Sequence, residues 1–265
     1  MSTQVFYRPA GRGLNFRPGL LALMLVWASV APAEPVVFRS GPEQVSLLEL
    51  YTSEGCSSCP PAEAWLTRLT NSPGLWTDFA PVAFHVDYWN DTGWRDPWSA
   101  PEFTERQRAF ARLWRSQNYY TPEFVLNGRE WQTWSSQRGF PPRRRAYQGV
   151  LEISSTNHLW WNASFQPAAA AGSYQIHVAL LAGGLSSQVR AGENRGRTLE
   201  HEFAALELAQ ARLTTSNGLA RGKCVLDAPR PAPETNLAVT AWVTRPGEMT
   251  PLQAAGGWLF PPAKK

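Results

Sequence analysis

The chain has 265 residues and a formal net charge of +4 at pH 7. Three arginines and no acidic residue precede residue 34, so the rest of the chain carries a net charge of about +1. A charge this small gives no argument for nucleic-acid binding. That remainder, roughly 230 residues, is long enough for one large domain or two small ones. With only three cysteines, a disulfide framework and a four-cysteine zinc site are both excluded.

Residues 1–33 have the order of a secretory signal peptide. Arg8, Arg12 and Arg17 form a basic start, an apolar run follows at 20–30, and Ala31-Pro32-Ala33 provides an A-x-A cleavage site. The run is well short of the roughly 20 residues that span a bilayer, although a membrane anchor or a buried N-terminal helix is the alternative. We therefore expect an exported protein, periplasmic or secreted, with no membrane span in the mature chain and in a compartment where disulfides form.

The segment after residue 44 predicts a strand, a dithiol and a helix. Val45–Tyr51 is apolar with little alternation, as in a central strand that is covered on both faces. A short loop leads to Cys56-Ser57-Ser58-Cys59, and apolar residues at 62, 65, 66 and 69 then follow at helical spacing. A thiol at a helix N-terminus faces unpaired backbone N–H groups and the positive end of the helix dipole, and both favour the thiolate. This order is typical of a reactive dithiol.

The order strand–helix continues through residue 157. We expect a second strand at 81–88, a helix at 103–114 and a strand at 123–126, which Asn127-Gly128 turns into a hairpin. A further helix is expected at about 141–151. Parallel strands joined by helices give an α/β fold class with βαβαββ order, and we assign it to residues 34–157.

Residues 158–265 are predicted to form a second, β-rich domain. Residues 174–180 and 237–243 alternate as strands, 192–196 has the composition of a turn, and 199–213 fits either a strand or a helix. A small sandwich, packed on or beside the first domain, would account for this pattern.

Two motifs resemble those of the thioredoxin fold. They are the strand and helix around Cys56-Ser57-Ser58-Cys59, and Thr121-Pro122 just before a later strand. The resemblance implies a thioredoxin-like βαβαββ domain with a β-rich extension, a cis Thr121–Pro122 bond, and a substrate-binding edge at these two residues. The dipeptide between the cysteines is Ser-Ser instead of the Gly-Pro of thioredoxins, so the direction of any redox reaction does not carry over.

Longer segments resemble a family of exported proteins of unassigned function. The matching segments are Leu48–Ala62, Phe84–Trp89, Gly93–Pro97, Arg106-Gln107 and Tyr120–Pro122. The resemblance covers roughly residues 45–260 and implies the same thioredoxin-like domain and β-rich extension. Because that family has no established activity, the resemblance informs the fold more than the function.

Together these features predict an exported thiol–disulfide oxidoreductase that acts on protein or small-molecule thiols or disulfides, with no cofactor and an unidentified redox partner. Cys56, nearer the helix start, is expected to be the more exposed sulfur and the nucleophile. Cys59 would resolve the mixed disulfide, and the oxidised form would contain a Cys56–Cys59 disulfide. The alternative is an inert disulfide that only holds the loop.

Two other functions remain open from the sequence. Cys56, Cys59 and His85 could bind copper(I), because soft thiolates select it, although no metal is the expectation. The chain could also be a non-catalytic interaction module.

Glu49 could relay the proton of the resolving cysteine, because burial raises a carboxyl pKa. Strand alternation, however, places Leu50 and not Glu49 on the face where thioredoxins keep their buried acid. This favours a structural role for the Glu49 carboxylate over a role in proton transfer. The remaining histidines, His158, His177 and His201, have no ligand-like spacing and are expected to be structural or on the surface.

Overall fold

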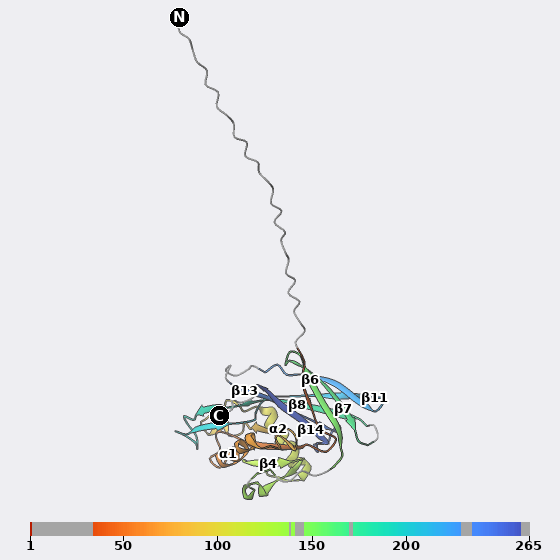
Figure 1. Cartoon of the computed structure of the whole chain (residues 1–265). Coiled ribbons are helices and arrows are strands. Elements are labelled where there is room, and N and C mark those ends of the chain that lie inside the picture. Colours follow the sequence, from red (N-terminus) through yellow and green to blue (C-terminus); the bar gives the residue numbers. More distant parts are fainter. Residues whose placement is uncertain (2–33, 138, 141–145, 170–171, 229–234, 261–265) are drawn as a thin grey trace. The chain divides into compact units, whose positions relative to one another are not determined.

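The structure is a computed structural model, and it describes residue 1 and residues 34–137, 139–140, 146–169, 172–228 and 235–260 (Figure 1). The predicted signal peptide lies outside the described residues. Within them, no helix combines the length and the apolar character that crossing a membrane requires. The helix expected at 141–151 falls partly outside the described residues, and its last three positions belong to a strand instead.

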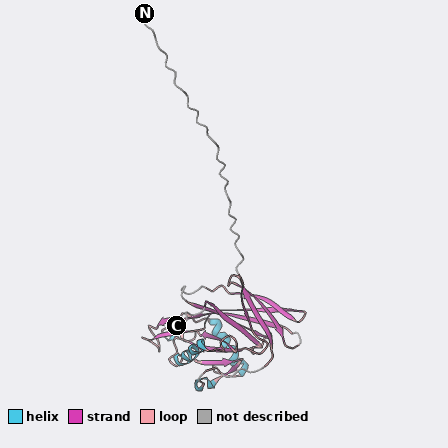
Figure 2. Cartoon of the chain, viewed as in Figure 1, coloured by secondary structure: helices cyan, strands magenta, loops and turns pink. Residues whose placement is uncertain are grey.

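The described chain is mostly β (Figure 2). Its elements are β1 (Val36–Arg39), β2 (Ser46–Thr52), α1 (Pro60–Arg68), β3 (Phe79–His85), α2 (Pro101–Trp114), β4 (Glu123–Leu126), β5 (Arg129–Glu130), β6 (Gly149–Ser155), β7 (Trp160–Pro167), β8 (Tyr174–Gly183), β9 (Leu185–Gln188), β10 (Thr198–His201), β11 (Ala204–Ser216), β12 (Leu219–Val225), β13 (Asn236–Thr244) and β14 (Gln253–Phe260), with short 3-10 helices at Leu69–Asn71, Asn90–Thr92 and Gln132–Ser136. Twelve of these strands form one mixed sheet, and β9 pairs with β10 alone.

The predicted fold class, an α/β thioredoxin-like βαβαββ domain followed by a mostly β extension, is wrong. The described residues contain two α-helices, of 9 and 14 residues, against a 12-stranded mixed sheet. Strand β3 pairs in parallel with β11 at Ala83 and Ala204, and the Ala83 N–H donates to the Phe203 carbonyl at 2.8 Å. An edge strand offers unpaired N–H and C=O groups, and here a strand from more than 100 residues later pairs with that edge at this one position.

Most local predictions are nevertheless confirmed. Strands β2, β3 and β4 and helices α1 and α2 lie within three residues of the predicted segments. Asn127 and Gly128 both have positive φ and join β4 to β5 as a hairpin. The ambiguous stretch 199–213 is β-structure, divided between β10 and β11.

Strand β11 connects two layers of the sheet. Its residues 204–213 pair with β8, and its residues 214–216 pair with β12. Strands β6, β7 and β12 pack against β8 and β13 over an apolar core, as two sheets do in a sandwich. The buried residues that form this core include Leu151, Ile153, Trp161, Phe165, Ile176, Val178, Val239 and Val243.

Side-chain alternation on β2 decides what each helix covers. Tyr51 stacks on Phe84 and contacts Phe110 of α2, so this face of the sheet lies under α2. Thr52 points to the other face, where its hydroxyl donates to Glu63 of α1 at 2.6 Å. His85 is the register partner of Thr52 and shares that face, which therefore brings polar groups of β2, β3 and α1 together.

Candidate functional site

The two cysteines lie in the turn that joins β2 to α1. The Cys56 N–H donates to the Ser53 carbonyl at 3.1 Å, and Cys59 immediately precedes the first residue of α1. Both cysteines are free thiols, so the predicted disulfide concerns the oxidised form and stays a prediction. The exposed fractions are 1% for Cys56 and 0% for Cys59, which means that Cys56 is covered almost as fully as its partner.

The pKa values of the two thiols shift in opposite directions. A hydrogen bond with Cys59 lowers the pKa of Cys56 to about 6; burial opposes this shift, and the Ser58 hydroxyl, 3.2 Å from Sγ, reinforces it. Burial raises the pKa of Cys59 well above its ordinary value, and the hydrogen bond with Cys56 adds to the rise. A thiol of pKa ~6 is roughly 90% thiolate at pH 7, so Cys56 is the more nucleophilic sulfur.

Thr121 and Pro122 lie against the dithiol. Their peptide bond is cis, as the resemblance implied, and the Thr121 carbonyl oxygen is 3.6 Å from Cys56 Sγ. Trp89 Nε1 donates to the Thr121 hydroxyl at 2.8 Å and holds this loop in place. The structure thus brings together the four predicted site residues, while the predicted substrate-binding role of Thr121 and Pro122 stays a prediction.

A loop from the second half of the chain covers the dithiol. Residues 189–197 connect β9 to β10, and we call them the covering loop. The Asn194 side chain is fully buried, and its Nδ2 donates to the carbonyls of Glu54 and Cys56, each at 2.9 Å. The Glu193 carboxylate accepts the Ser57 N–H at 3.0 Å. The covering loop therefore holds the backbone on both sides of Cys56, although its residues 192–196 have only the composition of a turn.

Beside the dithiol lies a group of buried ionisable side chains, Glu54, Glu63, His85, Asp96 and His201, which we call the His–carboxylate cluster. His201 contacts Glu63 through Nδ1 and Glu54 through Nε2, the latter at 2.9 Å. His85 contacts Asp96 through Nδ1 at 2.7 Å, and the two imidazole rings meet edge to face at 4.9 Å. The cluster joins residues of β3, α1, β10 and two loops.

In this cluster, the opposite charges beside three of the groups shift their pKa values more strongly than burial does. Burial by itself would raise the pKa values of Glu63 and Asp96, but His201 and His85 beside them hold both below their ordinary values. Burial by itself would lower the pKa of His201, but Glu63 and Glu54 raise it to about 10. Thr52 links this cluster to the dithiol, because its hydroxyl contacts the Cys59 thiol and donates to Glu63.

Other candidates from the sequence lie elsewhere. Glu49 faces α2, where it accepts hydrogen bonds from Arg106 Nε at 2.6 Å and from the Tyr51 hydroxyl at 3.0 Å. This buried pair favours the structural reading of Glu49. His177 is buried and stacks on Trp242, and burial lowers its pKa to about 3.

The histidine of the copper hypothesis is not grouped with the cysteines. In the part of the chain that the structure describes, one set of three or more His, Cys, Asp or Glu side chains has all its ligand atoms within 4.8 Å of one another, and it consists of Glu63, His85 and His201. Sequence reasoning missed Glu63 and His201. Glu63 follows Cys59 by one helical turn, and this spacing could have revealed it, whereas nothing local marks His201.

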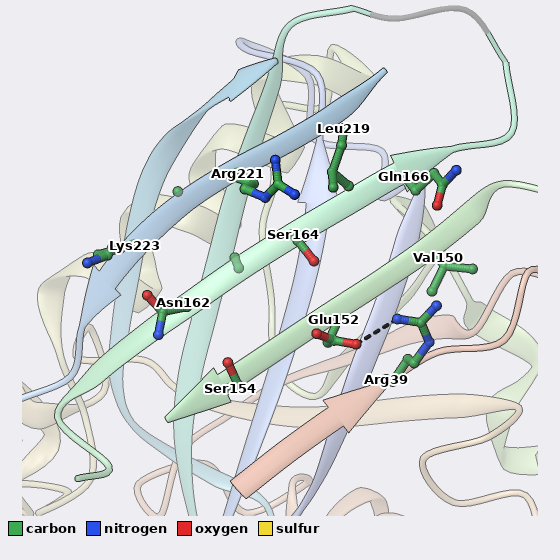
Figure 3. A pocket seen from close by; sticks show the side chains of 12 residues that line it. Arg39, Val150, Glu152, Ser154, Asn162, Ser164, Gln166, Leu219, Arg221 and Lys223 are labelled. Carbon is green, nitrogen blue, oxygen red and sulfur yellow. Dashed lines mark hydrogen bonds and ion pairs between the residues drawn. The ribbon is translucent and has the colours of Figure 1, made fainter. Parts of the chain in front are cut away.

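Two surface hollows among the described residues are lined by residues other than the two cysteines. One of about 580 Å³ lies over β6, β7 and β12, where polar side chains and the exposed Arg39–Glu152 ion pair line it (Figure 3). Another, of about 350 Å³, lies between α1 and β10, and Glu63 and Arg197 are among its lining residues. Only the second of these two reaches the His–carboxylate cluster.

Comparisons with known proteins identify a family model that matches this chain and two solved structures of similar fold. A family model described as "Protein of unknown function (DUF1223)" matches residues 47–244, while none of the curated proteins matches. The solved structure of protein AGR_C_4864 from Agrobacterium tumefaciens is similar, with a TM-score of 0.54 and 21% identity over 85% of this chain and 98% of that chain. HBP35 of Porphyromonas gingivalis has a TM-score of 0.55 and 12% identity over 85% of this chain and 79% of that chain.

Proposed function

The chain belongs to the DUF1223 family, whose function is unknown, and we therefore propose from its own site that it is an exported thiol–disulfide oxidoreductase. The observation that supports this most directly is the asymmetry of the dithiol. Two adjacent free thiols share a hydrogen bond that lowers the pKa of Cys56 to about 6, while burial raises that of Cys59. A purely structural cysteine pair has no need of this division between an attacking and a resolving sulfur.

The proposed reaction proceeds in two exchanges. The Cys56 thiolate attacks one sulfur of a substrate disulfide, forms a mixed disulfide and releases the other substrate sulfur as a thiolate, which takes up a proton. Cys59 then gives up its proton and attacks Cys56, so the second substrate sulfur leaves and a Cys56–Cys59 disulfide remains. Two electrons pass from the dithiol to the substrate; the reverse sequence oxidises a substrate dithiol.

The substrate is proposed to bind beside Thr121 and Pro122. The Thr121 carbonyl lies next to Cys56, so a peptide strand whose N–H groups meet this edge would place its own sulfur near the nucleophile. The two motifs that resemble those of thioredoxin-like proteins support a relation at the level of the site, while the overall fold differs. Export is proposed from the basic, apolar and A-x-A order of residues 1–33.

The decisive measurement is the reduction potential of the dithiol, together with the pH dependence of its alkylation. A potential above about −300 mV and an alkylation midpoint near 6 that disappears in Cys56→Ser are the expected results. Cys224→Ser is the control, because Cys224 is buried in the sandwich core and its pKa is raised to about 11. A potential below about −300 mV would identify a locked structural disulfide and contradict the proposal.

A further inference from the structure

Three side chains of the His–carboxylate cluster converge from separate elements. Glu63 of α1, His85 of β3 and His201 of β10 each offer one ligand atom, and these atoms lie within 4.8 Å of one another. All three residues are buried. Two imidazoles and one carboxylate form a donor set that first-row divalent metals use, and zinc enzymes with two histidines and a glutamate are an example.

The second nitrogen of one histidine has no partner among the described residues. The Nε2 atom of His85 is buried, and no described group lies within hydrogen-bond distance of it. Its Nδ1 contacts the Asp96 carboxylate at 2.7 Å, so Nδ1 holds the proton in the neutral ring and Nε2 presents a lone pair. A buried polar atom without a partner costs the free energy of its lost hydration, and metal coordination would compensate for that loss.

In each of the two histidines, one ring nitrogen also contacts a carboxylate outside the proposed ligand set. Asp96 accepts from His85 Nδ1, and Glu54 contacts His201 Nε2 at 2.9 Å. The remaining nitrogen of His201, Nδ1, contacts Glu63, and the remaining nitrogen of His85 is the Nε2 atom described above. Metal-ligating histidines almost always have their other nitrogen bound in this way, because the outer carboxylate sets the tautomer and the orientation of the ring.

The cluster also holds an excess of buried negative charge. Three carboxylates, those of Glu54, Glu63 and Asp96, surround two imidazoles. Among the described residues, the side-chain hydrogen bonds to these carboxylates come from the two histidines, Thr52 and Trp94, and none comes from lysine or arginine. A buried charge is stable when paired or bound to a metal, and a divalent cation would supply the missing positive charge.

We propose that Glu63, His85 and His201 form a binding site for one divalent first-row transition-metal ion, with zinc(II) as the ion that this donor set fits. The ion takes the place of the proton that His201 Nδ1 shares with Glu63, and that proton is released on binding. The hollow between α1 and β10 touches Glu63 and offers an approach from solvent. The cysteines are not ligands, so this site is independent of the proposed redox activity.

The test uses the full chain with both dithiol cysteines replaced, Cys56→Ser with Cys59→Ser, and zinc(II) alone as the probe. We expect one zinc ion per chain by equilibrium dialysis and metal analysis. Adding His85→Ala should abolish this binding, and Asp96→Asn should weaken it by about 10- to 100-fold through the lost outer contact. His158→Ala is the matched control, because His158 lies outside the cluster and should leave the affinity unchanged.

A spectroscopic measurement covers the case in which His85→Ala fails to fold. Cobalt(II) bound to the unmodified chain should show visible ligand-field bands without the intense near-ultraviolet band of a thiolate ligand. Failure of the dithiol-free chain to bind zinc, equal affinity in His85→Ala, or a thiolate band that vanishes with the cysteines would each overturn the proposed site. None of these results would alter the measured potential of the dithiol, so the two proposals can fail separately.

Discussion

The hydrogen bond between the two thiols is the largest cause of the low Cys56 pKa, so Cys59→Ala should raise that pKa from about 6. If the value returns to that of an ordinary thiol, ~8.5, the thiolate fraction at pH 7 falls from roughly 90% to about 3%, or about 30-fold. The thiolate of a weaker acid is also a better nucleophile. With a Brønsted coefficient of about 0.4–0.5, a rise of about 2.5 pKa units increases its intrinsic reactivity roughly 10- to 20-fold.

These two effects nearly cancel at neutral pH, so the pH profile and not a single rate is the informative measurement. We expect the rate of reaction with a small aromatic disulfide at pH 7 to fall only about two- to threefold in Cys59→Ala, whereas the midpoint of the profile moves upward and the plateau at pH 10 rises roughly tenfold. Cys59→Ser retains a hydroxyl donor and should keep most of the shift, which makes it the matched control. An unchanged midpoint in Cys59→Ala would refute this explanation of the low Cys56 pKa.

Three further predictions concern the covering loop, the buried Glu49–Arg106 pair and the Glu123 carboxyl. Asn194→Ala removes two hydrogen bonds from the covering loop and should speed alkylation of Cys56 at a fixed pH without moving the midpoint; equal rates would show that the loop does not limit access. Glu49→Ala leaves Arg106 buried without its carboxylate and should lower the free energy of unfolding by about 3–5 kcal/mol in denaturant titrations, with the Cys56 profile unchanged; an altered profile would argue for a relay role instead. Burial raises the pKa of Glu123 from 4.5 to about 7, so the folded state binds a proton more tightly than the unfolded state and stability falls as the pH rises through this window. Glu123→Gln should therefore raise the free energy of unfolding at pH 8, by about 3 kcal/mol at most, and leave it unchanged at pH 4. An equal increase at both pH values would contradict the raised pKa of Glu123.

The dithiol and its neighbouring elements could be predicted because the signals are local. The apolar run of β2, the spacing of the apolar residues in α1 and the Asn127-Gly128 hairpin each depend on residues close in the chain. The position of Glu49 was predictable for the same reason, since strand alternation alone separates its face from that of Leu50 and Thr52.

The fold class and the His–carboxylate cluster depend on contacts between distant residues. Periodicity identifies a strand but not the strand beside it. The pairing of β3 with β11 could therefore not be predicted, and it makes the expected α/β domain part of a 12-stranded sheet in a mostly β chain. His201 reaches Glu63 from 138 residues away, and Asn194 reaches Cys56 from the same distance. The sequence by itself determined the dithiol and its place at a helix start; only the tertiary structure decided what covers the sulfurs and which buried charges lie beside them, because tertiary packing, and not chain proximity, brings those groups together.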